Sequence, residues 1–225
     1  MGDNKREFFI GIDLGGRNKK TTAFCVLERR EKGIFPAELC CKKCETYFGK
    51  DIFKKIKPYL SSARVIAIDA PLTIGRGKGK MRLYEKFLSQ KIFREEKVNP
   101  LPPALMRDFS SFSQELRREF ESRGFVSDVN LIEVFPALAK KAVADNFVLN
   151  FLKKTCQSED QKSASFCAIL AYLHSILKTR YLGYKDGFLF LPEMSFWNQK
   201  WKDVFHRAWQ EKPYLHYRRL ITNLF

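Results

Sequence analysis

The stretch "FFIGIDLGGRNKKTTAFCVL", residues 8–27, contains two apolar runs joined by a glycine-rich linker. The first run, residues 8–14, is short and includes Asp13, and its length and composition predict a buried β-strand. The second run, residues 21–27, is rich in β-branched and aromatic residues, so we expect a second strand there. The linker "GGRNKK" has the composition of a turn, which predicts a hairpin. Taken alone, the stretch fits a metal-binding aspartate, a phosphate-binding loop and a simple hairpin equally well.

Two later apolar segments also carry an acidic residue at or near the end of a predicted strand. The segment "RVIAIDAP", residues 64–71, contains Asp69, and "VNLIEVFP", residues 129–136, contains Glu133. A carboxylate flanked by buried strand residues loses hydration, so it needs a hydrogen bond, an opposite charge or a bound cation. Because strand ends converge on one crevice of a sheet, we expect Asp13, Asp69 and Glu133 to lie close together. Three independent structural acids are the alternative.

A shared cluster of carboxylates favours one kind of chemistry. Carboxylate oxygens without a compensating His or Cys suit hard cations, so the expected cofactor is Mg²⁺ or Mn²⁺. Two such ions, about 4 Å apart, promote the in-line attack of water on a phosphodiester bond. The chain has 41 Lys and Arg against 25 Asp and Glu, a formal net charge of +16. Such a charge attracts polyanions, and nucleic acid is the expected partner, the alternative being a solvated surface rich in lysine.

A cationic, glycine-rich segment, "GRGKGKMR", follows Asp69 at residues 75–82. We expect its four cations to contact substrate phosphates, the alternative being a solvated loop. These cations are Arg76, Lys78, Lys80 and Arg82. The segment is not a Walker A loop, because Met follows Gly79-Lys80 and no Gly lies five residues before Gly79. Arg82 and Glu85 are also spaced for a local ion pair at i and i+3.

The order of predicted elements favours a single α/β domain over residues 1–225, since the chain is short for two ordinary domains. We expect a mixed sheet with helices covering its faces. Its predicted strands are residues 8–14, 21–27, 37–47, 64–71 and 129–136. Residues 73–128 are expected to form a helical insertion between two strands of this sheet, with one helix over roughly 81–95 and another ending at Gly124.

The remaining predicted elements are mostly helices. One is expected over residues 51–60 with Asp51 at its N-cap, and others near 137–152 and 160–180. A last short strand is predicted at residues 187–192. Residues 193–225 are expected to form a C-terminal helical extension, whose aromatic residues recur at helical spacing and predict a core-facing stripe. This stripe consists of Trp197, Trp201, Phe205 and Trp209.

The sequence contains no feature that predicts a membrane protein. No apolar run approaches the ~20 residues of a membrane-spanning helix. The first residues, "MGDNKREFFIG", lack the apolar core of a signal peptide, so a cytoplasmic location without a membrane partner is expected. Cys41 and Cys44 form a CxxC pair, but no second pair or HxxxH motif completes a structural zinc site.

Several of these segments, taken in order, carry a family resemblance. They are "GIDLGG", "VIAIDAPL", "RLYE", "IEVFP" and a late helix with A-x-x-C-A spacing. From about residue 8 to Pro192 the chain resembles the RNase H-like family of predicted nucleases catalogued as domain of unknown function 429. The resemblance implies an RNase H-like fold with a five-stranded mixed sheet, its first three strands antiparallel, flanked by helices. It also implies a Mg²⁺ site with carboxylates on the first strand, the fourth strand and a late helix, here Asp13 and Asp69, with Glu133 from its matching motif.

The chain departs from the family pattern at one position that matters. The family usually has Asp-Ala where this chain has Ser163-Ala164, and a serine cannot supply the negative charge. Asp160 lies three residues earlier, one turn back on the same helical face. The adjacent Glu159 points about 100° away around the helix. We therefore expect Asp160 to complete the metal site, the alternative being an incomplete site.

These patterns together predict a metal-dependent nuclease or phosphodiesterase. Asp13, Asp69 and Asp160 are expected to hold the ions, and Glu133 to bind them or orient the attacking water. A nucleic-acid-binding module with an incomplete site is the first alternative. The second is an ATP-using enzyme of the actin and sugar-kinase superfamily, whose first phosphate loop has a similar opening. Those enzymes normally have two such cores, for which 225 residues are few.

Overall fold

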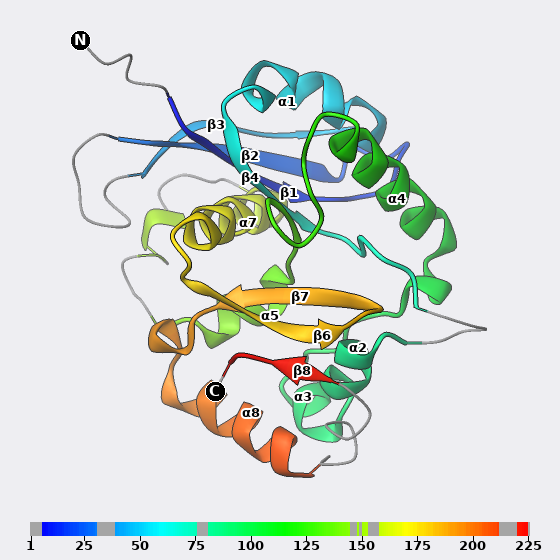
Figure 1. Cartoon of the computed structure of the whole chain (residues 1–225), viewed down its shortest axis with the longest axis vertical. Coiled ribbons are helices and arrows are strands. Elements are labelled where there is room, and N and C mark those ends of the chain that lie inside the picture. Colours follow the sequence, from blue (N-terminus) through cyan, green and yellow to red (C-terminus); the bar gives the residue numbers. More distant parts are fainter. Residues whose placement is uncertain are drawn as a thin grey trace.

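The structure is a computed structural model that describes residues 6–30, 39–75, 81–144, 148, 150–152, 158–211 and 220–224. The described residues form a five-stranded sheet and a three-stranded sheet, with helices beside both. Figure 1 shows the larger sheet in the upper half of the molecule and the smaller sheet below it. The α/β architecture predicted from the sequence is confirmed, whereas the second sheet was not predicted.

The larger sheet has the strand order β3-β2-β1-β4-β5. Its strands are β1 (Phe8–Asp13), β2 (Thr22–Arg29), β3 (Leu39–Tyr47), β4 (Ala63–Asp69) and β5 (Leu131–Glu133). Strands β1, β2 and β3 pair antiparallel, whereas β4 pairs parallel with both β1 and β5. The predicted hairpin and the predicted mixed sheet are therefore confirmed. Because β1, β4 and β5 run in the same direction, their carboxyl ends lie at one edge of the sheet.

Helix α7 (Glu159–Ser175) crosses one face of this sheet and packs against β1, β2 and β4. Its residues from Ala164 to Leu173 are all buried, as is typical of a helix in the centre of a core. The helix lies very close to β1 at Gly11, where a Cβ atom would be 2.1 Å from both the Ala164 carbonyl oxygen and the Ala168 amide nitrogen. The missing side chain at Gly11 therefore sets the distance between α7 and the sheet.

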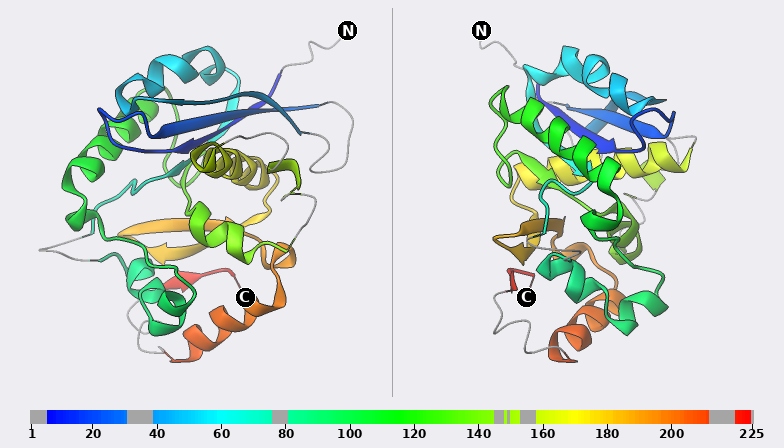
Figure 2. Two further views of the ribbon diagram at one scale, coloured as in Figure 1. Left: turned by 180° about the vertical axis from the view of Figure 1, so that it is seen from behind. Right: turned by 90° about the vertical axis from the view of Figure 1, so that its right-hand side faces the viewer.

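Helices α1 (Ile52–Leu60) and α4 (Arg107–Glu121) cover the opposite face. Figure 2 shows these two helices and α7 on either side of the larger sheet. The helix predicted over 51–60 is confirmed, and Asp51 is its N-cap residue, as predicted. Asp51 ends a 3₁₀ turn, η1 (Gly49–Asp51), that leads directly into α1, and its side chain makes no capping hydrogen bond.

The chain between β4 and β5 is largely helical, in keeping with the predicted insertion. It contains α2 (Leu83–Leu88), α3 (Lys91–Glu95), the 3₁₀ turn η2 (Pro103–Leu105) and α4. The single helix predicted over 81–95 is thus two short helices. The break allows Phe87 and Phe93 to meet with ring centroids 5.3 Å apart, and both rings also pack on Phe205.

The C-terminal third of the chain differs most from the prediction. The helix predicted to reach residue 180 ends at Ser175, and Leu177 follows with a positive φ of 60°. Strand β6 (Thr179–Tyr184) then pairs antiparallel with β7 (Gly187–Pro192), the strand predicted at 187–192. This hairpin buries Leu182, Leu189 and Leu191, which explains why a strand replaces the last helical turn.

The extension over 193–225 is helical only in part. It contains α8 (Gln199–Glu211), but it ends in β8 (Ile221–Thr222), which pairs with β6 as the third strand of the smaller sheet. The predicted aromatic stripe does face the core: Trp201 and Phe205 are buried on α8, and Trp197 is buried just before it. Helix α5 (Pro136–Ala142) opens the region predicted as helix near 137–152. Within the described ranges, no helix combines the length and the apolar character needed to span a membrane.

We predict that Gly11→Ala destabilises the protein by about 1–3 kcal/mol, because the added methyl group must displace the backbone of α7. Urea unfolding followed by circular dichroism measures the change. Gly16→Ala is the matched control, since a Cβ there meets only the flexible Lys19 side chain, at 3.4 Å or more. Equal stability of the two variants would show that α7 does not depend on Gly11.

Candidate functional site

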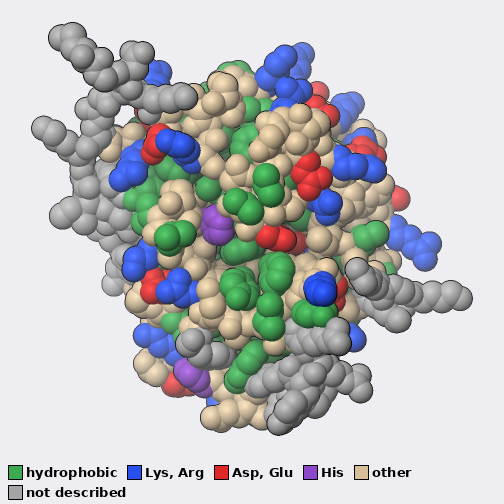
Figure 3. Space-filling model, in the orientation of Figure 1, with side chains coloured by type: hydrophobic (Ala, Val, Ile, Leu, Met, Phe, Trp, Pro, Cys, Tyr) green, Lys and Arg blue, Asp and Glu red, His purple; other side chains and the backbone are tan. Residues whose placement is uncertain are grey.

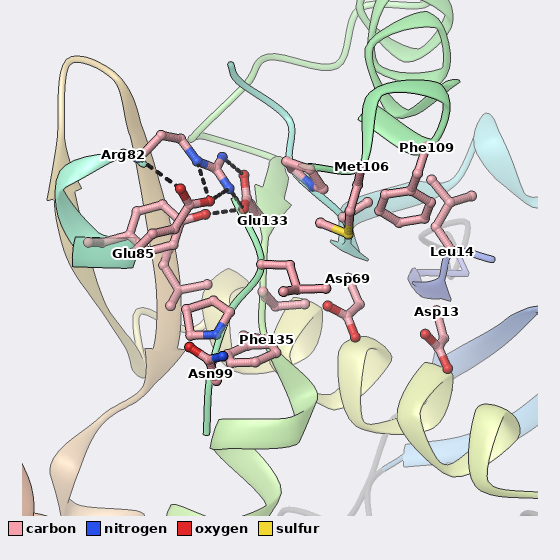
Figure 4. A pocket seen from close by; sticks show the side chains of 17 residues that line it. Asp13, Leu14, Asp69, Arg82, Glu85, Asn99, Met106, Phe109, Glu133 and Phe135 are labelled. Atoms are coloured by element: carbon pink, nitrogen blue, oxygen red, sulfur yellow. Dashed lines mark hydrogen bonds and ion pairs between the residues drawn. The ribbon is translucent and has the colours of Figure 1, made fainter. Parts of the chain in front are cut away.

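Two acidic side chains lie side by side at the carboxyl edge of the larger sheet. Asp13 ends β1, Asp69 ends β4, and the two residues are direct partners in the parallel register. Strand alternation places both on the face covered by α7, together with Gly11 and Ala67. Figure 4 shows the two carboxylates pointing the same way, toward that helix. The sequence-based prediction that Asp13 and Asp69 lie together therefore agrees with this geometry.

Asp160 lies in the first turn of α7 and is the third acidic group near this pair. The pKa of Asp13 is raised to about 7, first by burial and then by the negative charge of Asp160. The pKa of Asp69 is also raised, by burial and then by the charges of Asp13 and Glu133. Among the described residues, no donor forms a hydrogen bond with either carboxylate. The site therefore holds unbalanced negative charge that a cation or a proton would relieve.

One basic side chain offsets part of this charge. Lys140, on α5, donates a hydrogen bond from Nζ to the Ser163 Oγ atom at 3.0 Å. Its positive charge lowers the pKa of Asp13 and of Asp69, against the larger effect of burial. Ser163, which stands where the sequence resemblance implies an aspartate, here accepts a hydrogen bond from an ammonium group. Sequence reasoning did not identify Lys140, because that lysine comes from a separate helix, α5.

Glu133 is not part of the acidic pair. Its register partner is Ile68 and not Asp69, so it points toward the opposite face of the sheet. Its carboxylate accepts hydrogen bonds from Arg82 Nη1 and Nη2, both at 2.8 Å, from the Leu72 amide at 2.8 Å and from the Tyr84 hydroxyl. These donors occupy the lone-pair directions of both oxygens. The predicted role of Glu133 as a metal ligand or water-orienting base is therefore contradicted by its surroundings.

Arg82 is buried as well, with only 2% of its surface exposed. Its Nε and Nη2 atoms donate to Glu85 Oε1 at 2.9 and 2.6 Å, so the predicted local pair with Glu85 is present. Its Nη1 atom also donates to the Thr73 hydroxyl at 3.1 Å. The guanidinium group has no free face for a substrate phosphate, so that predicted role is wrong for Arg82. The other three predicted phosphate contacts, Arg76, Lys78 and Lys80, lie outside the described residues.

The buried ion network also joins the two sheets. Thr73, which follows β4, donates a hydrogen bond to the Asp186 carbonyl in the turn between β6 and β7, at 2.7 Å. The Asp186 carboxylate accepts from the Leu83 amide at the start of α2, at 3.0 Å. Figure 4 shows the Arg82, Glu85 and Glu133 part of this network beside the acidic pair. The network therefore holds the end of the larger sheet against the smaller one.

The two glycines of the opening hairpin do not form a free phosphate loop. The Gly15 amide donates to the Thr22 hydroxyl at 2.9 Å, and the Gly16 amide donates to the Thr21 hydroxyl at 3.2 Å. Side chains of the same hairpin thus satisfy the amides that a bound phosphate would require. Of the three interpretations that the opening stretch allowed, these contacts argue against the phosphate-binding loop and leave the metal-binding aspartate and the simple hairpin.

A cavity of about 300 Å³ lies between the acidic pair and the ion network. It opens at the carboxyl ends of β1, β4 and β5, which is where open α/β sheets usually bind ligands. Most of its wall is apolar, and Asn99 adds an amide group. The apolar side chains include Leu14, Pro71, Met106, Phe109, Phe135 and Leu189.

The acidic residues must be tested against the metal that the sequence predicts. Within the described parts of the chain, no three His, Cys, Asp or Glu side chains are close enough to hold an ion by themselves. Mg²⁺, however, keeps several water ligands and is commonly held by one or two carboxylates plus substrate phosphate. Asp13 and Asp69 accept no hydrogen bond from a described donor, so these two carboxylates fit the requirement of Mg²⁺ for one or two carboxylate ligands.

Comparison with protein-family models, with curated proteins and with solved structures gives no match to this chain. The interpretation of the site therefore depends on its own geometry.

We predict that Arg82→Met destabilises the protein by about 3–5 kcal/mol, because Glu85 and Glu133 lose their buried counter-charge. Chemical denaturation at neutral pH measures the loss. Arg64→Met is the matched control: Arg64 donates a hydrogen bond from Nε to Glu7 and forms an ion pair with it through Nη2, but at the surface, where about 0–1 kcal/mol is expected. Similar losses in both variants would contradict the structural role given to the buried network.

We also predict that Asp13→Asn makes the protein more stable at pH 8 but not at pH 4. A carboxyl group whose pKa rises from 3.8 to about 7 on folding keeps its proton in the folded state, so its contribution to stability falls as pH rises through that range. Asparagine cannot ionise, and the gain above pH 7 is on the order of a few kcal/mol. Urea unfolding in EDTA at both pH values measures it.

The control for this prediction is Asp203→Asn, which changes an exposed aspartate on α8. It should not alter the pH dependence of unfolding. If Asp13→Asn and Asp203→Asn behave alike, the Asp13 carboxyl group is not perturbed in the folded protein.

Proposed function

We propose that this protein is a metal-dependent phosphodiesterase with an RNase H-like fold, acting on nucleic acid. The strand order β3-β2-β1-β4-β5, with three antiparallel strands followed by two parallel ones, supports the fold assignment. So does the position of α7, which crosses the central strands and brings acidic residues to their carboxyl edge. The family resemblance of the sequence led to the same fold.

The observation that carries the proposal is the pair of neighbouring carboxylates, Asp13 and Asp69. Both are half-buried and have raised pKa values, and no described donor forms a hydrogen bond with them. Burying such groups without partners costs stability, so their presence in adjacent register indicates a function. A divalent cation is the ligand that would satisfy two unpaired carboxylates at once.

Asp13 and Asp69 are the residues that would hold Mg²⁺ or Mn²⁺, with Asp160 approaching from α7. When bound, the ion polarises a phosphoryl oxygen and makes a coordinated water nucleophilic at neutral pH. Lys140, bound to Ser163, adds a positive charge near the same carboxylates. Glu133 and Arg82 act by holding the strand ends in place.

The charge distribution supports a nucleic acid as the substrate. The chain carries a net charge of +16, and the acidic pair is half-buried in the cavity wall. On the face shown in Figure 3, Lys and Arg side chains lie mainly around the edge, while hydrophobic side chains reach the surface near the middle. This arrangement suits a nucleic acid: basic groups can contact its anionic phosphate backbone, and the less charged centre can contact its uncharged bases.

A second candidate is a nucleic-acid-binding module without catalysis. Ser163 and its bound Lys140 favour it, since together they replace one negative charge of the family pattern with a positive one. This candidate predicts salt-sensitive binding of nucleic acid and no cleavage with any divalent ion.

The catalytic proposal is tested by comparing neighbouring acidic residues. Asp13→Asn and Asp69→Asn should lower Mg²⁺- or Mn²⁺-dependent hydrolysis of DNA, RNA or an activated phosphodiester by roughly a hundredfold or more. Asp160→Asn should lower it by roughly tenfold or more. Glu159→Gln, next to Asp160 but exposed and paired with Lys162, is the control and should keep full activity. Cleavage by Asp13→Asn at the wild-type rate would reject the assignment.

A further inference from the structure

The cavity beside the acidic pair has the volume of a binding site for one small chemical group, such as a single ring system. Its volume of about 300 Å³ is at the lower end of ligand pockets, ~300–1,000 Å³. Met106 and Phe109, at the start of α4, contribute to its wall from one direction, and Phe135, after β5, contributes from another. These three side chains are half-buried, so part of each faces the open space. A flat apolar group could be covered by them.

The charges inside the cavity exclude a phosphate from its apolar part. Among its described lining residues, Arg82 is the single cation, and Glu85 and Glu133 neutralise it. Asp13 and Asp69 add negative charge at the other end. An anionic group inside would meet repulsion and no free cation, whereas an uncharged ring loses little on leaving water.

Asn99 supplies a polar contact at the rim. Its side chain is exposed, lines the cavity, and forms no hydrogen bond with any described residue. Asn99 and Phe135 line the same cavity, and both are labelled in Figure 4. A carboxamide offers a donor and an acceptor together, which matches the paired donor and acceptor atoms on the edge of a nucleobase.

We propose that this cavity holds one unstacked nucleobase of the strand whose phosphodiester bond lies at Asp13 and Asp69, an inference that rests on the proposed function. Phe109, Phe135 and Met106 cover the faces of the ring, and Asn99 binds its edge. Bases inside a duplex are stacked on their neighbours and cannot enter such a cavity. The substrate class is therefore single-stranded nucleic acid, or a strand from which one base is turned outward.

The experiment uses the full chain and short fluorescein-labelled single strands of DNA and of RNA, measured by fluorescence anisotropy in EDTA. One abasic nucleotide is moved along the strand, one position at a time. Binding should weaken roughly tenfold when the abasic nucleotide reaches the position held in the cavity, and little at other positions. The matching duplex should bind more weakly than the single strand.

Protein variants assign this effect to the cavity. Phe135→Leu keeps an apolar side chain but removes the ring, so it should weaken binding of the intact strand and leave binding of the sensitive abasic strand unchanged. Asn99→Ala should reduce the preference among the four bases at that position. Leu105→Ala removes a 73% exposed apolar side chain next to Met106 that does not line the cavity, and it is the matched control. Unfolding curves of all variants show whether they remain folded.

The outcomes separate this inference from the proposed function. If no abasic position weakens binding, while cleavage still depends on Asp13, the base-binding cavity is rejected and the phosphodiesterase is kept. If one abasic position weakens binding and Phe135→Leu has no further effect on that abasic strand, the base-binding cavity is kept. If, in addition, no divalent ion supports cleavage, the phosphodiesterase is rejected. A folded protein that binds no strand of either kind overturns both.

Discussion

Helix α7 packs directly on strand β1 because Gly11 has no side chain. A single added carbon atom would meet the backbone of α7 at both Ala164 and Ala168. Because the helix can lie against the strand, its first turn comes near the end of β1, where Asp160 acts on the pKa of Asp13. The same contact buries α7 among the central strands. Core packing and the position of the acidic residues thus share one physical cause.

The buried carboxylates of this protein fall into two classes with opposite consequences. Glu85 and Glu133 are paired with Arg82, and this network fixes the larger sheet against the turn between β6 and β7. Such pairs offset the cost of desolvation only when every donor and acceptor is satisfied, as nearly all are here. Asp13 and Asp69 are half-buried, accept no hydrogen bond from a described donor, and have raised pKa values. Holding the carboxylates of Asp13 and Asp69 without hydrogen-bond donors lowers the stability of the folded protein. Such a cost is typical of a site retained for function.

The proposed function assigns separate tasks to the two ends of one cavity. The acidic end, with Lys140 nearby, suits the reacting phosphate and a divalent cation, while the apolar end suits a base. The division follows from charge: a phosphate is stabilised where a cation can bridge it to carboxylates, and it is repelled where none can. Lys140 bound to Ser163 gives this chain a permanent positive charge in a region where the resembling family usually has an aspartate. Its effect on Asp13 and Asp69 is to lower their proton affinity.

The strands of the larger sheet and the proximity of Asp13 and Asp69 could be predicted from the sequence, because short apolar runs that end in acids are local patterns. The same pattern also grouped Glu133 with them, and the rest of the site depends on contacts between distant segments. Register against β4 turned Glu133 to the other face, and burial made Arg82 its partner although the cationic segment around it resembles a solvated loop. The hydrogen bond from Lys140 to Ser163 and the pairing of β6 with β8 likewise bring together residues that are distant in the sequence. A one-residue shift in register reverses the face of a strand, and ion pairing depends on burial, so neither can be inferred from local sequence.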